Sequence, residues 1–180
     1  DGCLSFRKYM NSKTEAPEFG IKRENEERRD GGCGIIFNPK TGLFAVGEHT
    51  DGGFLRLFSG GVEDGEDIEK GVLREVLEES GLYDYESVQQ IAQATSHYYN
   101  SLKKVNRVAF ATCFLIIVKS DDIKPVELED HEKFFLAWKS SDEILLNWKK
   151  HNENKDLDHW FYFFDKALKI LNESGRIAGY

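Results

Sequence analysis

The stretch at residues 60–82, GGVEDGEDIEKGVLREVLEESGL, constrains the fold of this chain more than any other segment. Its apolar residues recur at helical spacing, which predicts an amphipathic helix over residues 66–80 with one buried face. Acidic residues near its start, such as Glu66, lie where the helix dipole favours negative charge. Gly81 is well placed to end the helix in a left-handed cap. The predicted buried face consists of Ile68, Val72, Leu73, Val76 and Leu77.

Three carboxylates share one face of this predicted helix. Glu75, Glu78 and Glu79 are spaced i, i+3 and i+4, so they are neighbours one turn apart. Like charges at this spacing repel each other and destabilise a helix, so a compensating positive charge is expected. Mg²⁺ suits that task, because it takes carboxylate oxygens and completes its coordination with waters and substrate phosphates. A pair of glutamates alone, by contrast, is most often a solvated acidic helix face.

The residues around the carboxylates add a backbone loop and a counter-charge. Gly60 and Gly61 precede the helix, where glycines let the backbone approach a ligand closely. Arg74 cannot bind a metal, but it can pair with Glu66 or Glu78 and hold that side chain in a fixed rotamer. The glycines are therefore candidates for substrate binding, and Glu66 and Arg74 are candidates for supporting roles.

The whole segment resembles the Nudix box, Gly-x5-Glu-x7-Arg-Glu-U-x-Glu-Glu-x-Gly-U, where U is a bulky aliphatic residue. Every specified position matches, and a chance match arises roughly once in 10⁹ placements on average composition. One departure lies before the box glycines, where Ser59 stands in place of the proline found in many members. The matching residues are Gly60, Glu66, Arg74, Glu75, Val76, Glu78, Glu79, Gly81 and Leu82.

The resemblance implies a Nudix-type α/β/α sandwich with a mixed β-sheet. It also implies a pyrophosphohydrolase that cleaves a nucleoside diphosphate linked to another moiety, by attack of water on phosphorus. By the same resemblance, Glu78 and Glu79 are the main metal ligands, and Glu75 binds a further ion or orients the water. Glu66 and Arg74 support them. The expected metal is Mg²⁺, with Mn²⁺ as the alternative.

A general base is expected from outside the box. The segment 127–132 carries four carboxylates just before a predicted strand that contains Trp138. Glu132 is the first choice, because its distance from Trp138 matches the usual placement in the family, and Glu129 is the second. The alternative, a solvated loop of carboxylates, stays open. Arg56 and Arg107 are candidates to contact phosphate.

The segments that flank the box alternate between strands and helices. Strands come first, then the box helix, then two longer strands and another short one, and two helices follow. That order predicts an α/β fold with a mixed sheet. The predicted strands are 33–38, 43–49, 54–58, 91–100, 107–120 and 133–139, and the predicted helices begin at caps Asp142 and Asp158 and end at Trp148 and Asn172.

Residues 1–30 are polar and show no strong period, which predicts an N-terminal arm before a Nudix domain at residues 31–180. An edge strand or a dimer-forming segment stays as the alternative, so a homodimer remains open. Two other interpretations also stay open. One is a Nudix-fold module that binds a nucleotide without cleaving it, and the other is a domain of a larger protein. The complete set of three glutamates argues against the pure binding module.

Composition limits the partners. The formal net charge is −8, so without a local basic patch the chain is a poor candidate for gripping a long nucleic acid. Its longest apolar run, residues 108–118, is too short to span a membrane. Cys3, Cys33 and Cys113 lack CxxC spacing, which favours unpaired thiols in a reducing compartment. Together with the resemblance, this predicts a cytoplasmic protein whose partner is a nucleotide-derived small molecule.

Overall fold

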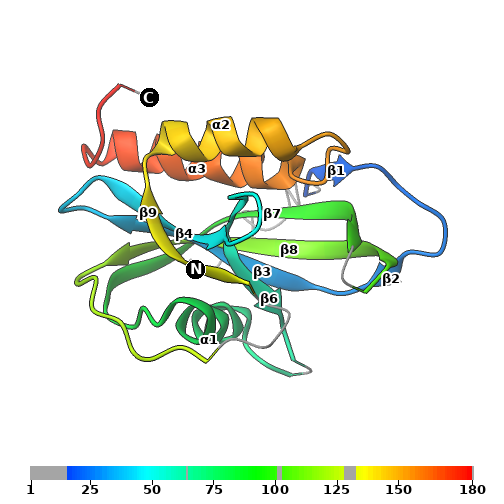
Figure 1. Cartoon of the computed structure of the whole chain (residues 1–180), viewed down its shortest axis with the longest axis horizontal. Helices are drawn as coiled ribbons and strands as arrows, with labels where there is room; N and C mark the ends of the chain where they lie inside the picture. Colours follow the sequence, from blue (N-terminus) through cyan, green and yellow to red (C-terminus); the bar gives the residue numbers. More distant parts are fainter. Residues whose placement is uncertain (1–15, 64, 101–102, 128–132, 180) are drawn as a thin grey trace, which may run out of the picture.

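One helix covers one face of a mixed β-sheet and two helices cover the other, so the chain folds into three layers (Figure 1). The computed structural model describes residues 16–63, 65–100, 103–127 and 133–179. Helix α1 (Ile68–Ser80) lies alone on its side of the sheet, while α2 (Ser141–His151) and α3 (Asp158–Glu173) lie together on the opposite side. The predicted α/β/α sandwich is therefore confirmed.

The sheet is mixed, as predicted. Strand β3 (Gly31–Asn38) runs parallel to β8 (Val105–Val118), which pairs antiparallel with the long strand β7 (Tyr85–Asn100). On its other side, β3 forms an antiparallel hairpin with β4 (Leu43–His49). This hairpin is the one predicted from the proline and glycine between its two strands.

Three short strands complete the sheet, and one of them contains the box glycines. β6 (Phe58–Gly61) pairs antiparallel with the beginning of β3, so the box glycines lie beside the middle of the sheet. β5 (Leu55–Arg56) and β9 (Phe134–Lys139) both pair antiparallel with β4. The predicted strand at 54–58 is thus two strands, because the chain leaves β4 for β3 at Leu57.

The N-terminal segment contributes strands of its own. β1 (Glu18–Gly20) pairs in parallel with β7, and β2 (Glu27–Arg28) pairs in parallel with β8. The strand alternative for this segment is therefore the one that residues 16–30 adopt. The division of the chain into an arm at 1–30 and a domain at 31–180 stays a prediction. Residues 1–15, with Cys3, lie outside the described residues.

Two hydrophobic cores form because successive side chains of a strand point to opposite faces. In β3, Cys33, Ile35 and Phe37 pack towards α2 and α3, whereas Ile36 packs towards α1. β8 alternates in the same way, with Cys113, Leu115 and Ile117 towards α2 and α3, and Phe114, Ile116 and Val118 towards α1. Burial on both faces explains why these strands read as continuous apolar runs in the sequence.

The helix ends agree only in part with the predicted caps. Asp67 caps α1 by accepting from the N–H of Lys70 at 3.1 Å, and Gly81 ends it at φ 78°, the left-handed conformation that glycine adopts without strain. The cap predicted at Asp142 is wrong, because Ser140 caps α2 in a reciprocal pair with Glu143.

The predicted cap of the last helix is also wrong, since Asp158 is the first residue of α3 and no side chain caps that helix. The strand predicted at 91–100 begins earlier, at Tyr85. Register shifts near Ser87 and Ala92 interrupt its alternation and hide the pattern. No helix within the described ranges is long and apolar enough to cross a membrane.

Candidate active site

Glu79 is a buried carboxylate held from two sides. Only 6% of its surface is exposed. One of its oxygens accepts a hydrogen bond from Nη2 of Arg56 at 2.9 Å, and the other accepts from the backbone N–H of Ser59 at 3.1 Å. The guanidinium carbon of Arg56 in turn lies 4.5 Å from the ring centre of Phe134. Strands β5, β6 and β9 thus surround the buried end of the carboxylate face of α1.

Arg74 ties the other carboxylates of this face together. Its Nε and Nη2 donate to the two oxygens of Glu66 at 3.0 and 3.1 Å. Its Nη1 donates to Glu75 at 2.9 Å and to Glu78 at 3.2 Å. The bond with Glu66 is the main reason why the pKa of Arg74 lies above its ordinary value, and bonding to Arg74 lowers the pKa of Glu66. The structure therefore contains the pairing of Arg74 with Glu66 and Glu78 that the spacing predicts.

The box glycines make room for this network. A Cβ atom on Gly60 would overlap the carboxyl group of Glu75, so any other residue there would displace that side chain. Gly61 lies under the guanidinium of Arg29, and its carbonyl oxygen is 3.5 Å from Nη2 of Arg74. Both glycines thus allow charged side chains to lie directly against the backbone of β6.

The donor set fits a divalent cation in composition and charge. Among the described residues the network joins four glutamates to two arginines, so negative charge is in excess. Carboxylate oxygens are the ligands that Mg²⁺ and Mn²⁺ prefer. No three potential ligands within the described ranges converge on one point as they now lie. To hold an ion, Glu75, Glu78 and Glu79 would turn from their arginine partners towards it.

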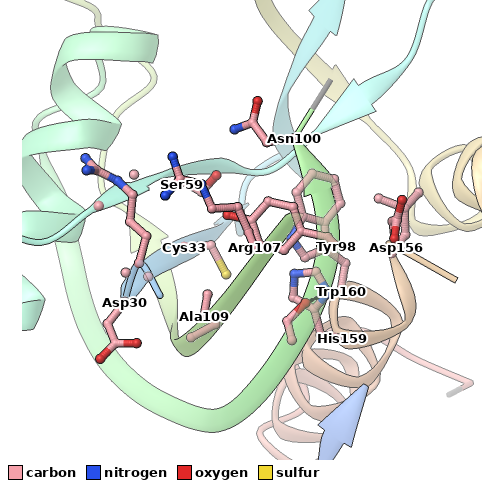
Figure 2. Close-up of a pocket in the computed structure, with 18 of the residues that line it drawn as sticks. Asp30, Cys33, Ser59, Tyr98, Asn100, Arg107, Ala109, Asp156, His159 and Trp160 are labelled. Carbon is pink, nitrogen blue, oxygen red and sulfur yellow. Dashed lines mark hydrogen bonds between the residues drawn. The ribbon is translucent and has the colours of Figure 1, made fainter. Parts of the chain in front are cut away.

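A pocket of about 410 Å³ opens beside β6, between the sheet and the start of α3 (Figure 2). Its walls come from elements far apart in the sequence, and its edge includes the box glycines. The residues that line it include Arg29, Cys33, Phe54, Ser59, Gly60, Gly61, Ser96, Tyr98, Arg107, Asp156, His159, Trp160 and Phe163.

Burial sets the protonation of two pocket side chains. Burial lowers the pKa of His159 to about 4, so this ring is neutral at pH 7, and its Nδ1 lies 3.0 Å from the hydroxyl of Ser96. Burial raises the pKa of Tyr98, although the nearby charges of Arg107 and Arg29 act in the opposite direction. The pocket therefore presents a neutral imidazole on one side and positive charge on another.

The predicted site residues fall into three groups. The box residues come together at α1, where Arg74, Glu75, Glu78 and Glu79 lie on the helix and Glu66, predicted as its first residue, lies in the loop before it. The predicted phosphate-contacting arginines separate, because Arg56 lies at Glu79 while Arg107 lines the pocket. The predicted bases Glu132 and Glu129 lie outside the described residues.

Sequence reasoning missed several pocket residues. Arg29, His159 and Trp160 line the pocket together with the box glycines, but they come from the loop before β3 and from α3. No motif or spacing relates them. Only the pairing of β3 with β8 and the packing of α3 on the sheet bring them together.

Comparison with known proteins places this geometry in a family. The family model described as NUDIX domain matches residues 27–161, which covers both the carboxylate face and most of the pocket. A search of curated proteins found no match to the chain.

Several solved structures share the fold at low sequence identity. The NUDIX domain of Shewanella oneidensis NrtR, complexed with ADP ribose, has a TM-score of 0.52 and 11% identity, with 67% of this chain and 78% of that chain covered. The MutT protein of Methanosarcina mazei Go1 has a TM-score of 0.51 and 19% identity, with 86% and 100% covered. The Ap4A hydrolase of C. elegans has a TM-score of 0.50 and 15% identity, with 81% and 99% covered.

Proposed function

We propose that this chain, which belongs to the NUDIX family and is a hydrolase acting on pyrophosphate bonds, cleaves a nucleoside diphosphate linked to another moiety. The proposed reaction depends on Mg²⁺. The observation that carries the proposal is the position of Glu75, Glu78 and Glu79 on one face of α1, packed against the glycines of β6 and next to a pocket large enough for a small molecule. Two of the structural neighbours are described as binding ADP ribose and as an Ap4A hydrolase, which supports a nucleotide-derived substrate.

The three glutamates of α1 divide the work of holding metal ions. We assign Glu78 and Glu79 as the main ligands and Glu75 as the ligand of a further ion or the group that orients the attacking water. Bound Mg²⁺, or Mn²⁺ in its place, would neutralise the diphosphate and stabilise the leaving oxygen. Gly60 keeps Glu75 close to the backbone of β6, so that its carboxyl group stays beside the pocket.

The two arginines of the network have different tasks in this proposal. Arg74 is a positioning residue, since it holds Glu66, Glu75 and Glu78 without facing the pocket. Arg56 pairs with Glu79 in this structure. Once Glu79 has another positive partner, Arg56 is available to contact a substrate phosphate beside Gly60 and Gly61.

Water attack on phosphorus also requires a proton acceptor. Metal ions bound by the box carboxylates would lower the basicity of these groups. We therefore keep Glu132 as the proposed general base and Glu129 as the second choice. Both belong to the acidic segment just before β9, the strand that places Phe134 against Arg56.

A substrate panel tests the proposal directly. Purified protein is incubated with nucleoside diphosphate sugars, dinucleoside polyphosphates and dinucleotide cofactors, with Mg²⁺ and with EDTA, and the released nucleoside phosphates are quantified. We expect Mg²⁺-dependent release from at least one class. Absence of turnover across the panel in both Mg²⁺ and Mn²⁺ would contradict the proposed activity.

A further inference from the structure

The pocket beside the box differs in chemical character from one end to the other. One side of it carries the guanidinium groups of Arg29, which lies against Gly61 of β6, and of Arg107, and both charges lie near Tyr98. The end that adjoins α3 carries the neutral ring of His159 and the indole of Trp160. A ligand that matches this arrangement has one anionic end and one flat, uncharged end.

Arg29 places an available positive charge at the entrance from the carboxylate face. Its guanidinium packs so closely on Gly61 that a Cβ atom there would lie 2.7 Å from its Nη2. Its guanidinium has no hydrogen-bonded or ion-paired acceptor among the described residues. Within the described part of the chain, the guanidinium of Arg29 is therefore available to an anion beside Gly61, at the boundary between the box and the pocket.

Arg107 adds a second, more buried guanidinium. Its side chain is 11% exposed, and its Nη1 donates to Glu27, a mostly exposed carboxylate, at 2.9 Å. Its Nε is buried and has no hydrogen-bond partner within the described part of the chain. A buried donor without an acceptor costs free energy, which a small shift of the side chain onto an anionic ligand would recover.

The two arginines act on the same part of the pocket. Strand register places Arg107 opposite Tyr98, and Figure 2 shows the two side chains next to each other. Both Arg107 and Arg29 act electrostatically on the hydroxyl of Tyr98, so both charges lie near that ring. The carboxylates of the pocket do not cancel them, because Asp30 pairs with Arg28 and Asp156 pairs with Arg23.

The opposite end suits a planar ring. The rings of Phe54 and Trp160 are nearly parallel, with an angle of 10° and a centroid distance of 6.1 Å. His159 is held by the hydroxyl of Ser96 at 3.0 Å, which fixes the orientation of its neutral ring. Aromatic and neutral polar groups of this kind hold a nucleobase by packing and hydrogen bonding. They carry no positive charge that would attract a second phosphate.

We propose that Arg29 and Arg107 bind the phosphate of a nucleoside 5′-phosphate unit whose base lies towards His159 and Trp160. The assignment rests on the proposed function, and it specifies which half of the substrate occupies the pocket. The nucleoside half lies in the pocket, and the other moiety extends past the carboxylates of α1. The same site then holds the nucleoside monophosphate product after cleavage.

Metal-free titration calorimetry tests this subsite separately from catalysis. AMP, GMP, CMP and UMP are each titrated into the full chain in EDTA, alongside the corresponding nucleosides. At least one monophosphate should bind at least tenfold more tightly than its nucleoside, and Arg29→Met and Arg107→Met should each remove most of that difference. Arg107→Lys should retain part of it, because the charge remains. Arg176→Met removes an arginine that pairs with Glu86 outside the pocket, so it should bind as the wild type does.

Two results would overturn the assignment. One is monophosphate binding no tighter than nucleoside binding in the wild type, and the other is an unchanged advantage in both methionine variants. Thermal melting of each variant shows whether it is folded. If Arg107→Met does not fold, the binding measured with Arg107→Lys tests the role of this residue instead. Turnover in the substrate panel separates the two proposals. Turnover without arginine-dependent binding removes only the subsite, whereas arginine-dependent binding without turnover removes only the hydrolase proposal.

Discussion

This protein contains two clusters of glutamates, which differ in the number and kind of partners that their carboxylates have. On α1, Glu75 and Glu78 share one nitrogen of Arg74, and Glu79 depends on Arg56. With Glu66 also bound to Arg74, the carboxylates of this network outnumber its arginines.

The second cluster joins the N-terminal segment to β7. The two ring nitrogens of His97 lie 2.6 Å from Glu18 and 2.8 Å from Glu26, and Glu18 also pairs with Lys22. Glu26 accepts a further hydrogen bond from the N–H of Arg23. Here the carboxylates and their partners are matched in number. We therefore treat the arginine-held cluster of α1 as the functional cluster, and the cluster around His97, whose carboxylates and partners match in number, as the balanced, structural cluster.

The largest expected effect comes from removing the charge of one carboxylate in the functional cluster. We expect Glu79→Gln to lower turnover by about 100-fold or more, because a metal ligand contributes several kcal/mol to charge stabilisation in the transition state. The amide keeps the shape of the side chain but weakens the ion pair with Arg56, so the metal-free melting temperature should fall modestly while the protein stays folded. Steady-state kinetics in Mg²⁺ and thermal melting in EDTA measure both effects.

Glu69→Gln is the matched control, because Glu69 lies on the same helix but is exposed and outside the network. It should retain wild-type turnover. Near-normal turnover in Glu79→Gln would mean that the buried carboxylate does not bind the metal.

The acidic segment that precedes β9 in the sequence provides the next test, because it carries the proposed general base. We expect Glu132→Gln to lower kcat by roughly 10²–10⁴ with little change in metal affinity, as loss of a general base does. Glu129→Gln is the second variant to measure. If both single variants and the double variant keep most of their activity, the base lies elsewhere, with Glu75 as the next candidate.

Arg56 tests whether the positive partner of Glu79 also serves the substrate. We expect Arg56→Gln to raise KM by about tenfold or more with a smaller change in kcat, the effect of losing one charged hydrogen bond to phosphate. The KM and kcat values of the preferred substrate separate this role from metal binding. If kcat falls by a similar factor while KM is unchanged, Arg56 only positions Glu79 and does not contact the substrate.

The balanced cluster should respond in stability and not in activity. We expect Glu26→Gln to lower the free energy of unfolding by about 1–2 kcal/mol, because it removes a charged partner from a buried ring. Turnover should be unchanged. Urea denaturation gives the first value, and the exposed neighbour Glu24 provides the control variant Glu24→Gln. A clear loss of turnover in Glu26→Gln would remove the distinction between the two clusters.

The smallest expected effect is in the pH dependence of stability. Burial raises the pKa of Glu26, but the N–H of Arg23 and the ring of His97 outweigh burial, so the pKa lies below its ordinary value of 4.5. The stability that this lowered pKa contributes is therefore present above pH 4.5 and is lost as the pH falls through the folded value. The difference in melting temperature between the wild type and Glu26→Gln should shrink as the pH is lowered from 6 to 3. A constant difference over that range would contradict this assignment.

The local sequence determined the α1 face. Helical spacing alone places Glu75, Glu78 and Glu79 on one side, and Gly81 ends the helix because its φ of 78° suits glycine. The pairing of Arg74 with Glu78 follows from the same i, i+4 geometry, whereas Glu66 reaches Arg74 from the loop before the helix. These features depend on neighbours within a few turns, so the spacing of the residues along the chain is sufficient to predict them.

The pocket and the partners of Glu79 were decided by tertiary structure. Arg29 and Arg107 both lie near Tyr98 because β2 and β3 both pair with β8, and His159 reaches Ser96 because α3 packs on β7. Strand register brings these residues together, and register depends on the packing of both faces of the sheet. No spacing in the chain encodes it. The proposed metal ligands can therefore be predicted from the sequence of one helix. The pocket residues proposed to select the substrate come together only through contacts between segments far apart in the sequence.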